Sequence, residues 1–157
     1  MKKPAESPLG PRTSAPNFDS IQTVQSRERR GVLRVLIADD YEAVRAGLCA
    51  LLESVDIEVC AQAQNGEEAV EKSIQLRPDL IILDISMPGL GGIEAARRIR
   101  AFLPEVPILF FTTHDTPQLF AIAKAVGAQG FVTKDRVAAT LLNAVDALLK
   151  KQTFFNL

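Results

Sequence analysis

The stretch that decides the fold is Leu80-Ile81-Ile82-Leu83-Asp84-Ile85-Ser86-Met87-Pro88-Gly89. Its opening run of aliphatic residues is too uniform for a strand with one face in water and too short for a buried helix. Asp84 ends this run, and Pro88 and Gly89 then signal a turn, because both residues favour turn geometry. The stretch therefore predicts a strand buried on both faces that carries a carboxylate at its end.

Similar short apolar runs recur on both sides of this strand. Segments with apolar residues at the 3.6-residue helical repeat separate them. The other predicted strands are Val32–Ala38, Ile57–Ala61, Ile108–Phe111 and Phe131–Val132. A strand and helix alternation of this kind predicts an α/β fold, a doubly wound, five-stranded parallel sheet with right-handed crossovers and helices on both faces.

The helices are predicted from apolar spacing and from one start signal. The first predicted helix carries Val44, Leu48, Leu51, Leu52 and Val55, the third Ile93, Ala96 and Ile99, the fourth Leu119, Ile122, Ala123 and Val126, and the last Leu141, Val145 and Leu148. Thr116-Pro117 is typical of a helix start, because proline is tolerated in the first turn.

Composition divides the chain into three parts. Residues 1–31 contain prolines among Ser, Thr and Gly, with few large apolar residues, and predict a disordered leader. The folded domain is expected at residues 32–150. Residues 151–157 are expected to form a short tail with no output domain.

Charge and hydropathy narrow the class of protein. Residues 1–31 carry 6 Lys and Arg against 3 Asp and Glu, and the remainder carries 12 against 16, so the predicted domain is mildly acidic. Domains that bind DNA through its phosphates concentrate positive charge on one face, so we expect no direct nucleic-acid binding. No apolar run reaches the roughly 18 residues needed to cross a membrane, and no signal core is evident, so a cytoplasmic protein is expected.

Polar residues follow the predicted strands at their carboxyl ends. The first strand ends in Asp39-Asp40, the third in Asp84, the fourth in Thr112 and the fifth in Lys134. The carboxyl ends of parallel strands share one edge of the sheet, so we expect these side chains in one crevice. Clustered carboxylates repel one another unless a cation neutralises them, and oxygen ligands without His or Cys suit Mg²⁺. Asp40 and Asp84 are expected as direct ligands, and Asp39 through water.

A carboxylate in such a site can also act as a nucleophile. It can form an aspartyl phosphate if a metal and positive side chains stabilise the charge on the phosphoryl oxygens. Lys134 can supply that charge, and the Thr112 hydroxyl can donate a hydrogen bond. Taken singly, these residues have simpler interpretations: Asp39-Asp40 as helix caps, Asp84 as a turn residue, Thr112 as a strand former and Lys134 as a solvated charge.

Four segments stand in a characteristic order along the chain. They are Leu36-Ile37-Ala38-Asp39-Asp40, the stretch from Leu80 to Gly89, Phe111-Thr112, and Gly127-Ala128-Gln129-Gly130-Phe131-Val132-Thr133-Lys134. Together they resemble the receiver-domain family of two-component response regulators, over residues 32–150, which implies a flavodoxin-like (βα)5 fold. The resemblance implies that Mg²⁺ is held by Asp39, Asp40, Asp84 and the backbone carbonyl of Ser86. It also implies Thr112 and Phe131 as switch residues and Lys134 as the phosphoryl-stabilising lysine.

The resemblance also implies a function and a set of partners. Asp84 would accept a phosphoryl group from a sensor histidine kinase or a phosphotransfer protein in a Mg²⁺-dependent step. The chain would be a signalling domain rather than an enzyme, with at most self-catalysed transfer and autodephosphorylation. Output is expected through a protein-binding surface of the fourth helix, fifth strand and fifth helix, with a phosphorylation-dependent homodimer as a further expectation. The Lys134-Asp135 step resembles the subgroup usually joined to a helix-turn-helix domain.

Two alternatives remain at this point. A pseudo-receiver would keep the fold as a binding module without phosphorylation, which the filled acidic and switch positions disfavour. A hydrolase of the haloacid-dehalogenase kind also uses an Asp nucleophile and Mg²⁺. It needs a general acid two residues after the nucleophile, where this chain has Ser86.

Overall fold

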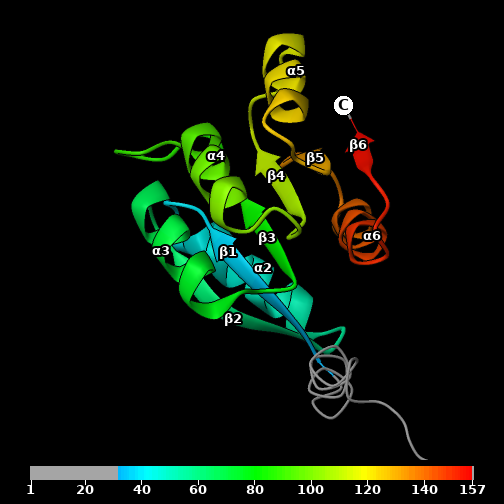
Figure 1. The fold of residues 1–157 in the computed structure, drawn as a ribbon. Helices are drawn as coiled ribbons and strands as arrows, with labels where there is room; N and C mark the ends of the chain where they lie inside the picture. The colour runs from blue at the N-terminus through cyan, green and yellow to red at the C-terminus, as the bar shows by residue number, and fades with distance from the viewer. Residues whose placement is uncertain (1–31, 157) are drawn as a thin grey trace, which may run out of the picture. The chain divides into compact units, whose positions relative to one another are not determined.

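A computed structural model describes residues 32–156, and the predicted leader at residues 1–31 lies outside this range. Within it, six parallel strands form one sheet in the order β2-β1-β3-β4-β5-β6 (Figure 1). They are β1 Leu33–Ala38, β2 Ile57–Ala63, β3 Leu80–Leu83, β4 Ile108–Thr112, β5 Gly130–Thr133 and β6 Phe154–Asn156. The predicted class, a doubly wound parallel α/β sheet, is confirmed.

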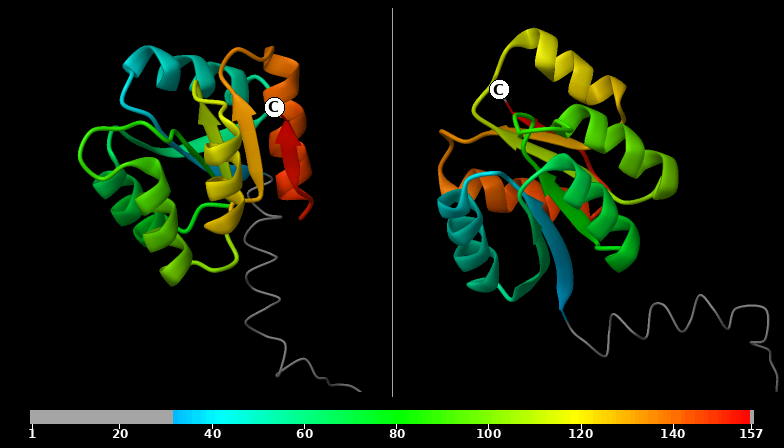
Figure 2. Two further views of the ribbon diagram at one scale, coloured as in Figure 1. Left: turned by 90° about the horizontal axis from the view of Figure 1, so that it is seen from above. Right: turned by 90° about the vertical axis from the view of Figure 1, so that its left-hand side faces the viewer.

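Five helices of the described residues connect the strands and cover both faces of the sheet, as the left view of Figure 2 shows. They are α2 Glu42–Glu53, α3 Gly66–Leu76, α4 Gly92–Phe102, α5 Pro117–Ala125 and α6 Ala138–Leu149. Side chains of α2 and α6 share one apolar core with one face of the sheet. Those of α3, α4 and α5 share a second core with the opposite face. Because β3 lies between these cores, all its residues are buried.

The sheet has one strand more than the sequence predicts. Phe154–Asn156 pairs in parallel with β5, in the segment that the sequence assigns to a tail. A segment of three residues is too short for its sequence pattern to indicate a strand. Their partner, the outer edge of β5, exists only once the sheet has formed. The five-stranded prediction is therefore wrong in its number of strands.

Two helices begin at side-chain caps. The hydroxyl oxygen of Thr116 accepts the backbone N–H of Leu119 at 3.2 Å, and Pro117 occupies the first turn of α5, as predicted. Asn65 caps α3 in the same way, accepting the N–H of Glu68 at 2.8 Å. These caps accept hydrogen bonds from first-turn N–H groups, which have no acceptor within their own helix.

No helix between residues 32 and 156 combines the length and the apolar character needed to cross a bilayer.

Candidate functional site

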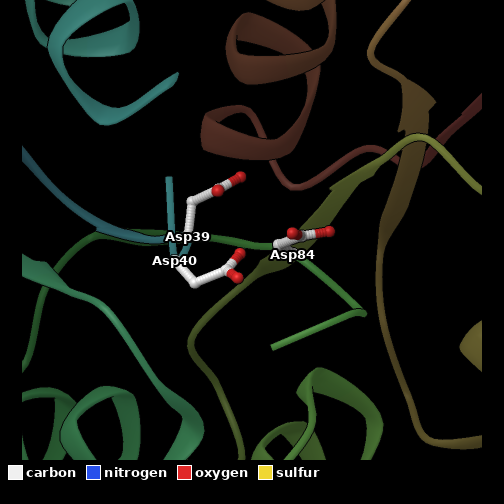
Figure 3. Close-up of side chains that lie close together, drawn as sticks. All are labelled: Asp39, Asp40 and Asp84. Atoms are coloured by element: carbon white, nitrogen blue, oxygen red, sulfur yellow. The ribbon is translucent and has the colours of Figure 1, made fainter. Parts of the chain in front are cut away.

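Three carboxylates meet at the carboxyl ends of β1 and β3 (Figure 3). These strands are neighbours, with Ala38 paired to Leu83, so the residues that follow them lie side by side. The N–H of Asp84 donates to the carbonyl oxygen of Ala38 at 2.9 Å, which continues the pairing to the site. Oxygen atoms of Asp39, Asp40 and Asp84 lie within 4.8 Å of one another. The register of two neighbouring strands therefore assembles the acidic cluster.

Lys134 brings a positive charge to two of these carboxylates. Its Nζ lies 2.6 Å from Oδ2 of Asp39 and 3.2 Å from Oδ2 of Asp84. Its backbone N–H donates to the carbonyl oxygen of Thr112 at 2.8 Å, which ties the end of β5 to the end of β4. The side chains of Asp39 and Asp84 are 2% and 5% exposed, so water screens these ion pairs far less than it screens surface pairs.

Burial and charge pairing set the protonation of the site. Burial raises the pKa of Asp84 above its usual value, although the Lys134 charge and hydrogen bonds from Lys134 and Thr112 act in the opposite direction. Burial alone would lower the pKa of Lys134. The hydrogen bond to Asp39 and the charges of Asp84 and Asp39 outweigh that effect and raise its pKa. Lys134 is therefore protonated at neutral pH, and the surroundings disfavour the ionised form of Asp84.

Asp40 differs from the other two carboxylates in its contacts. Its Oδ1 is buried and has no hydrogen-bond partner among the described residues. Leaving a buried carboxylate oxygen without a donor is costly. A divalent cation would satisfy it, and the carboxylates of Asp39, Asp40 and Asp84 are the oxygen ligands that Mg²⁺ prefers. The set of ligands present therefore fits Mg²⁺.

The aspartates after β1 are not helix caps. The N-cap of α2 is Tyr41, whose side chain makes no capping hydrogen bond. Oδ1 of Asp39 instead accepts the backbone N–H of Tyr41 at 2.9 Å, which turns the chain out of the strand. The capping interpretation of Asp39-Asp40 is therefore wrong.

The remaining predicted site residues differ in exposure. Thr112 ends β4 and is fully buried, and its hydroxyl oxygen accepts the backbone N–H of His114 at 3.3 Å. Ser86 lies in the loop after β3 and is exposed. Phe131 lies in β5 and is fully buried, with its ring edge-on to that of Phe120 in α5 at 5.4 Å between centroids. The Phe131 ring therefore lies inside the protein, against α5.

Two residues that hold the site are missed by the sequence interpretation. Nη1 of Arg45, in α2, donates to the backbone oxygen of Asp39 at 2.7 Å. Gly92 begins α4 so close to the end of β3 that a Cβ there would overlap the backbone oxygen of Asp84. The glycine pair Gly91-Gly92 is visible in the sequence. Only the close approach of Gly92 to the backbone of Asp84 explains why a glycine stands there. Within the site, Arg45 contacts a main-chain oxygen, and such a contact leaves no mark in a sequence pattern.

Residues 35–146 match the family model of the response regulator receiver domain. The chain belongs to this family. The transcriptional regulatory protein LnrK of Bacillus subtilis is 40% identical over 115 residues, which are 73% of this receiver chain and 52% of that protein. The response regulator GacA of Pseudomonas viridiflava is 31% identical over 126 residues, 80% of this chain and 59% of that protein. The receiver chain thus spans a little over half the length of these curated relatives.

Solved receiver structures share the fold. A two-component response regulator of the LuxR family from Aurantimonas sp. SI85-9A1 superposes with a TM-score of 0.76 at 35% identity, covering 78% of this chain and 89% of that chain. The isolated REC domain of RcsB from Salmonella enterica serovar Typhimurium, solved with the phosphomimetic BeF3−, gives a TM-score of 0.74 at 26% identity. That match covers 79% of this chain and 93% of the other. Sequence and fold therefore agree on the receiver family.

Proposed function

We propose that this receiver domain accepts a phosphoryl group on Asp84 from a sensor histidine kinase or a phosphotransfer protein. The observation that carries the proposal is the contact between Lys134 Nζ and Oδ2 of Asp84, inside the cluster formed with Asp39 and Asp40. Asp84 directly follows β3 and faces the partly buried ammonium group of Lys134, which is the setting that a carboxylate nucleophile needs. Membership of the receiver family supports the same role.

The transfer uses groups that the site already holds. An oxygen of Asp84 attacks phosphorus, the bond from phosphorus to the donor nitrogen breaks, and an acyl phosphate forms. Lys134, kept protonated by its carboxylate partners, stabilises the charge on the phosphoryl oxygens, and the Thr112 hydroxyl donates a further hydrogen bond. Asp39, Asp40, Asp84 and the carbonyl of Ser86 would hold Mg²⁺, which neutralises phosphoryl charge when bound.

Phosphorylation would then change the surface formed by α5, β5 and α6, where a downstream protein or a second receiver binds. β5 connects the two places, since Lys134 follows its end and Phe131 lies within it. Phe131 contacts Phe120 of α5, so a shift of β5 reaches that helix through ring contacts. A switch of this kind needs an element with two arrangements that the local charge change biases.

The test is phosphorylation of the full chain by acetyl phosphate and Mg²⁺, followed by intact-mass measurement. Wild type should gain the mass of one phosphoryl group, and it should gain none in excess chelator. Asp84→Asn should gain none under either condition. Asp146→Asn is the matched control, because Asp146 forms an exposed surface pair with Lys150. This variant should gain the same phosphoryl mass as wild type. The same increment in Asp84→Asn as in wild type would move the phosphorylation site elsewhere.

A further inference from the structure

The outer edge of β5 is occupied by a short strand near the end of the chain. β6 lies beside it in Figure 1 and pairs with it in parallel. In this register Gly130 is opposite Phe154 and Phe131 is opposite Phe155. The N–H of Phe154 donates to the carbonyl oxygen of Gln129 at 2.9 Å. A Cβ on Gly130 would come within 3.1 Å of the Phe154 carbonyl oxygen and closer still to the side chains of Leu109 and Leu148, so both β6 and the core pack tightly against this glycine.

Two consecutive aromatic side chains anchor this strand on opposite faces of the sheet. Phe154 packs against the core that α2 and α6 share with the sheet. Phe155 packs against the other core, with its ring 5.3 Å from the ring of Phe120 and 4.8 Å from Nζ of Lys124. Alternation of side chains along a strand allows neighbouring residues to fill two sites. The outer edge of β5 therefore binds a segment with an extended backbone and two adjacent aromatic residues.

Structural features set β6 apart from the rest of the receiver. It lies beyond residue 146, where the family match ends, and both of its aromatic side chains are only partly buried. It follows a short tether in which the N–H groups of Lys151 and Gln152 donate to the carbonyl oxygens of Leu148 and Ala147 and so end α6. Release of the strand beyond this cap would leave both α6 and the pairing of β5 with β4 in place.

We propose that the β5 edge is a strand-docking site, filled in cis by Phe154–Asn156 and able to take the same segment from a second copy of the chain. The second copy is the occupant to which the structure points, because the segment seen to fit the edge is the chain's own. Exchange of an identical element keeps every contact of the docked strand and adds only the cost of association. The exchange would join two receivers through the surface of α5, β5 and α6.

Peptide binding tests the docking site without phosphorylation. The probe is a fluorescein-labelled peptide of residues 151–157, titrated by anisotropy into the full chain carrying Phe154→Ser and Phe155→Ser, here called the opened variant. The opened variant should bind the peptide roughly ten-fold or more tightly than wild type, since the tethered strand competes at an effective concentration on the order of millimolar. Phe102→Ser is the matched control, because Phe102 is an exposed aromatic residue of α4 that lies outside β6.

A second pair of changes locates the bound peptide. A peptide with Phe155→Asp should bind the opened variant several-fold more weakly, because the ring contact with Phe120 is lost. Adding Lys124→Glu to the opened variant should also weaken binding of the unchanged peptide, because Lys124 lies over the Phe155 ring. If the opened variant binds the peptide no better than wild type or Phe102→Ser does, the edge is not a docking site.

Native mass spectrometry over a concentration series tests the occupant. Wild type and Phe102→Ser should form a dimer that grows with concentration, and the opened variant should remain a monomer because it has no strand to donate. Equal dimer fractions in wild type and the opened variant, or a wild type that stays monomeric throughout, would overturn strand exchange. None of these readouts involves Asp84, so failure of phosphorylation and failure of strand docking are separate results.

Discussion

Asp40→Asn should make the receiver more stable without Mg²⁺ and less stable with it. Two unit charges 4.8 Å apart repel by about 3.5 kcal/mol at an effective dielectric of about 20. Asp40 faces the carboxylates of Asp39 and Asp84, and the charge of Lys134 offsets one of them, which leaves roughly one repulsion uncompensated. Asp40 is partly exposed, so solvent screening reduces this to about 1–2 kcal/mol in favour of the neutral amide.

The sign should reverse when Mg²⁺ is added. A ligand at about 100 times its dissociation constant stabilises the folded state by about 2.7 kcal/mol. Wild type should gain an increment of this size, whereas Asp40→Asn, having lost a charged oxygen ligand, should gain little. The two urea-unfolding curves should therefore change order between excess chelator and saturating Mg²⁺.

Urea unfolding of wild type, Asp40→Asn and Asp146→Asn in both conditions is the assay. Asp146 is 65% exposed, so its neutralisation should change the free energy of unfolding by no more than about 0.5 kcal/mol in either condition. A loss of stability for Asp40→Asn in chelator would refute the repulsion argument. A Mg²⁺ response equal to that of wild type would refute Asp40 as a ligand.

Three further predictions concern the strand ends. Because burial raises the pKa of Asp84, its contribution to stability is full below the usual carboxyl pKa of 3.8 and is lost as the pH rises through the folded value. In chelator, the free energy of unfolding of Asp84→Asn should therefore fall less than that of wild type as the pH rises across this range. Urea unfolding at a series of pH values measures this difference. Thr112→Ala should still accept a phosphoryl group. When beryllofluoride is added, its hydrogen exchange at residues 121–126 and at Phe131 should change much less than that of wild type. A change as large as in wild type would exclude a relay through the hydroxyl. Gly92→Ala should lower the free energy of unfolding by about 1–3 kcal/mol, because its Cβ meets backbone. The control Gly47→Ala, with open space in the middle of α2, should raise it by about 0.5–1 kcal/mol.

The helix and strand order follows from local pattern, and local pattern also fails in identifiable places. The aliphatic run before Asp84 and the Thr116-Pro117 step are signals contained in a few consecutive residues, and the structure has a strand and a helix start there. Val55 fits the apolar spacing of α2 but lies beyond its last residue and is 44% exposed. Spacing alone does not tell where a helix ends, because a turn residue can continue the same repeat for one more position.

The sequence by itself determined that carboxylates, a hydroxyl and a lysine stand at the ends of parallel strands, and such ends always share one edge of a sheet. Only the tertiary structure decided which of them touch. Lys134 pairs with Asp39 and Asp84 and leaves Oδ1 of Asp40 without a partner among residues 32–156, because strand register fixes where the side chains reach. The closeness of Gly92 to the main chain of Asp84 and the docking of Phe154–Asn156 on β5 depend on backbone atoms brought together from distant parts of the chain. Every residue supplies the same backbone atoms, so residue types cannot encode those contacts until the sheet has placed them.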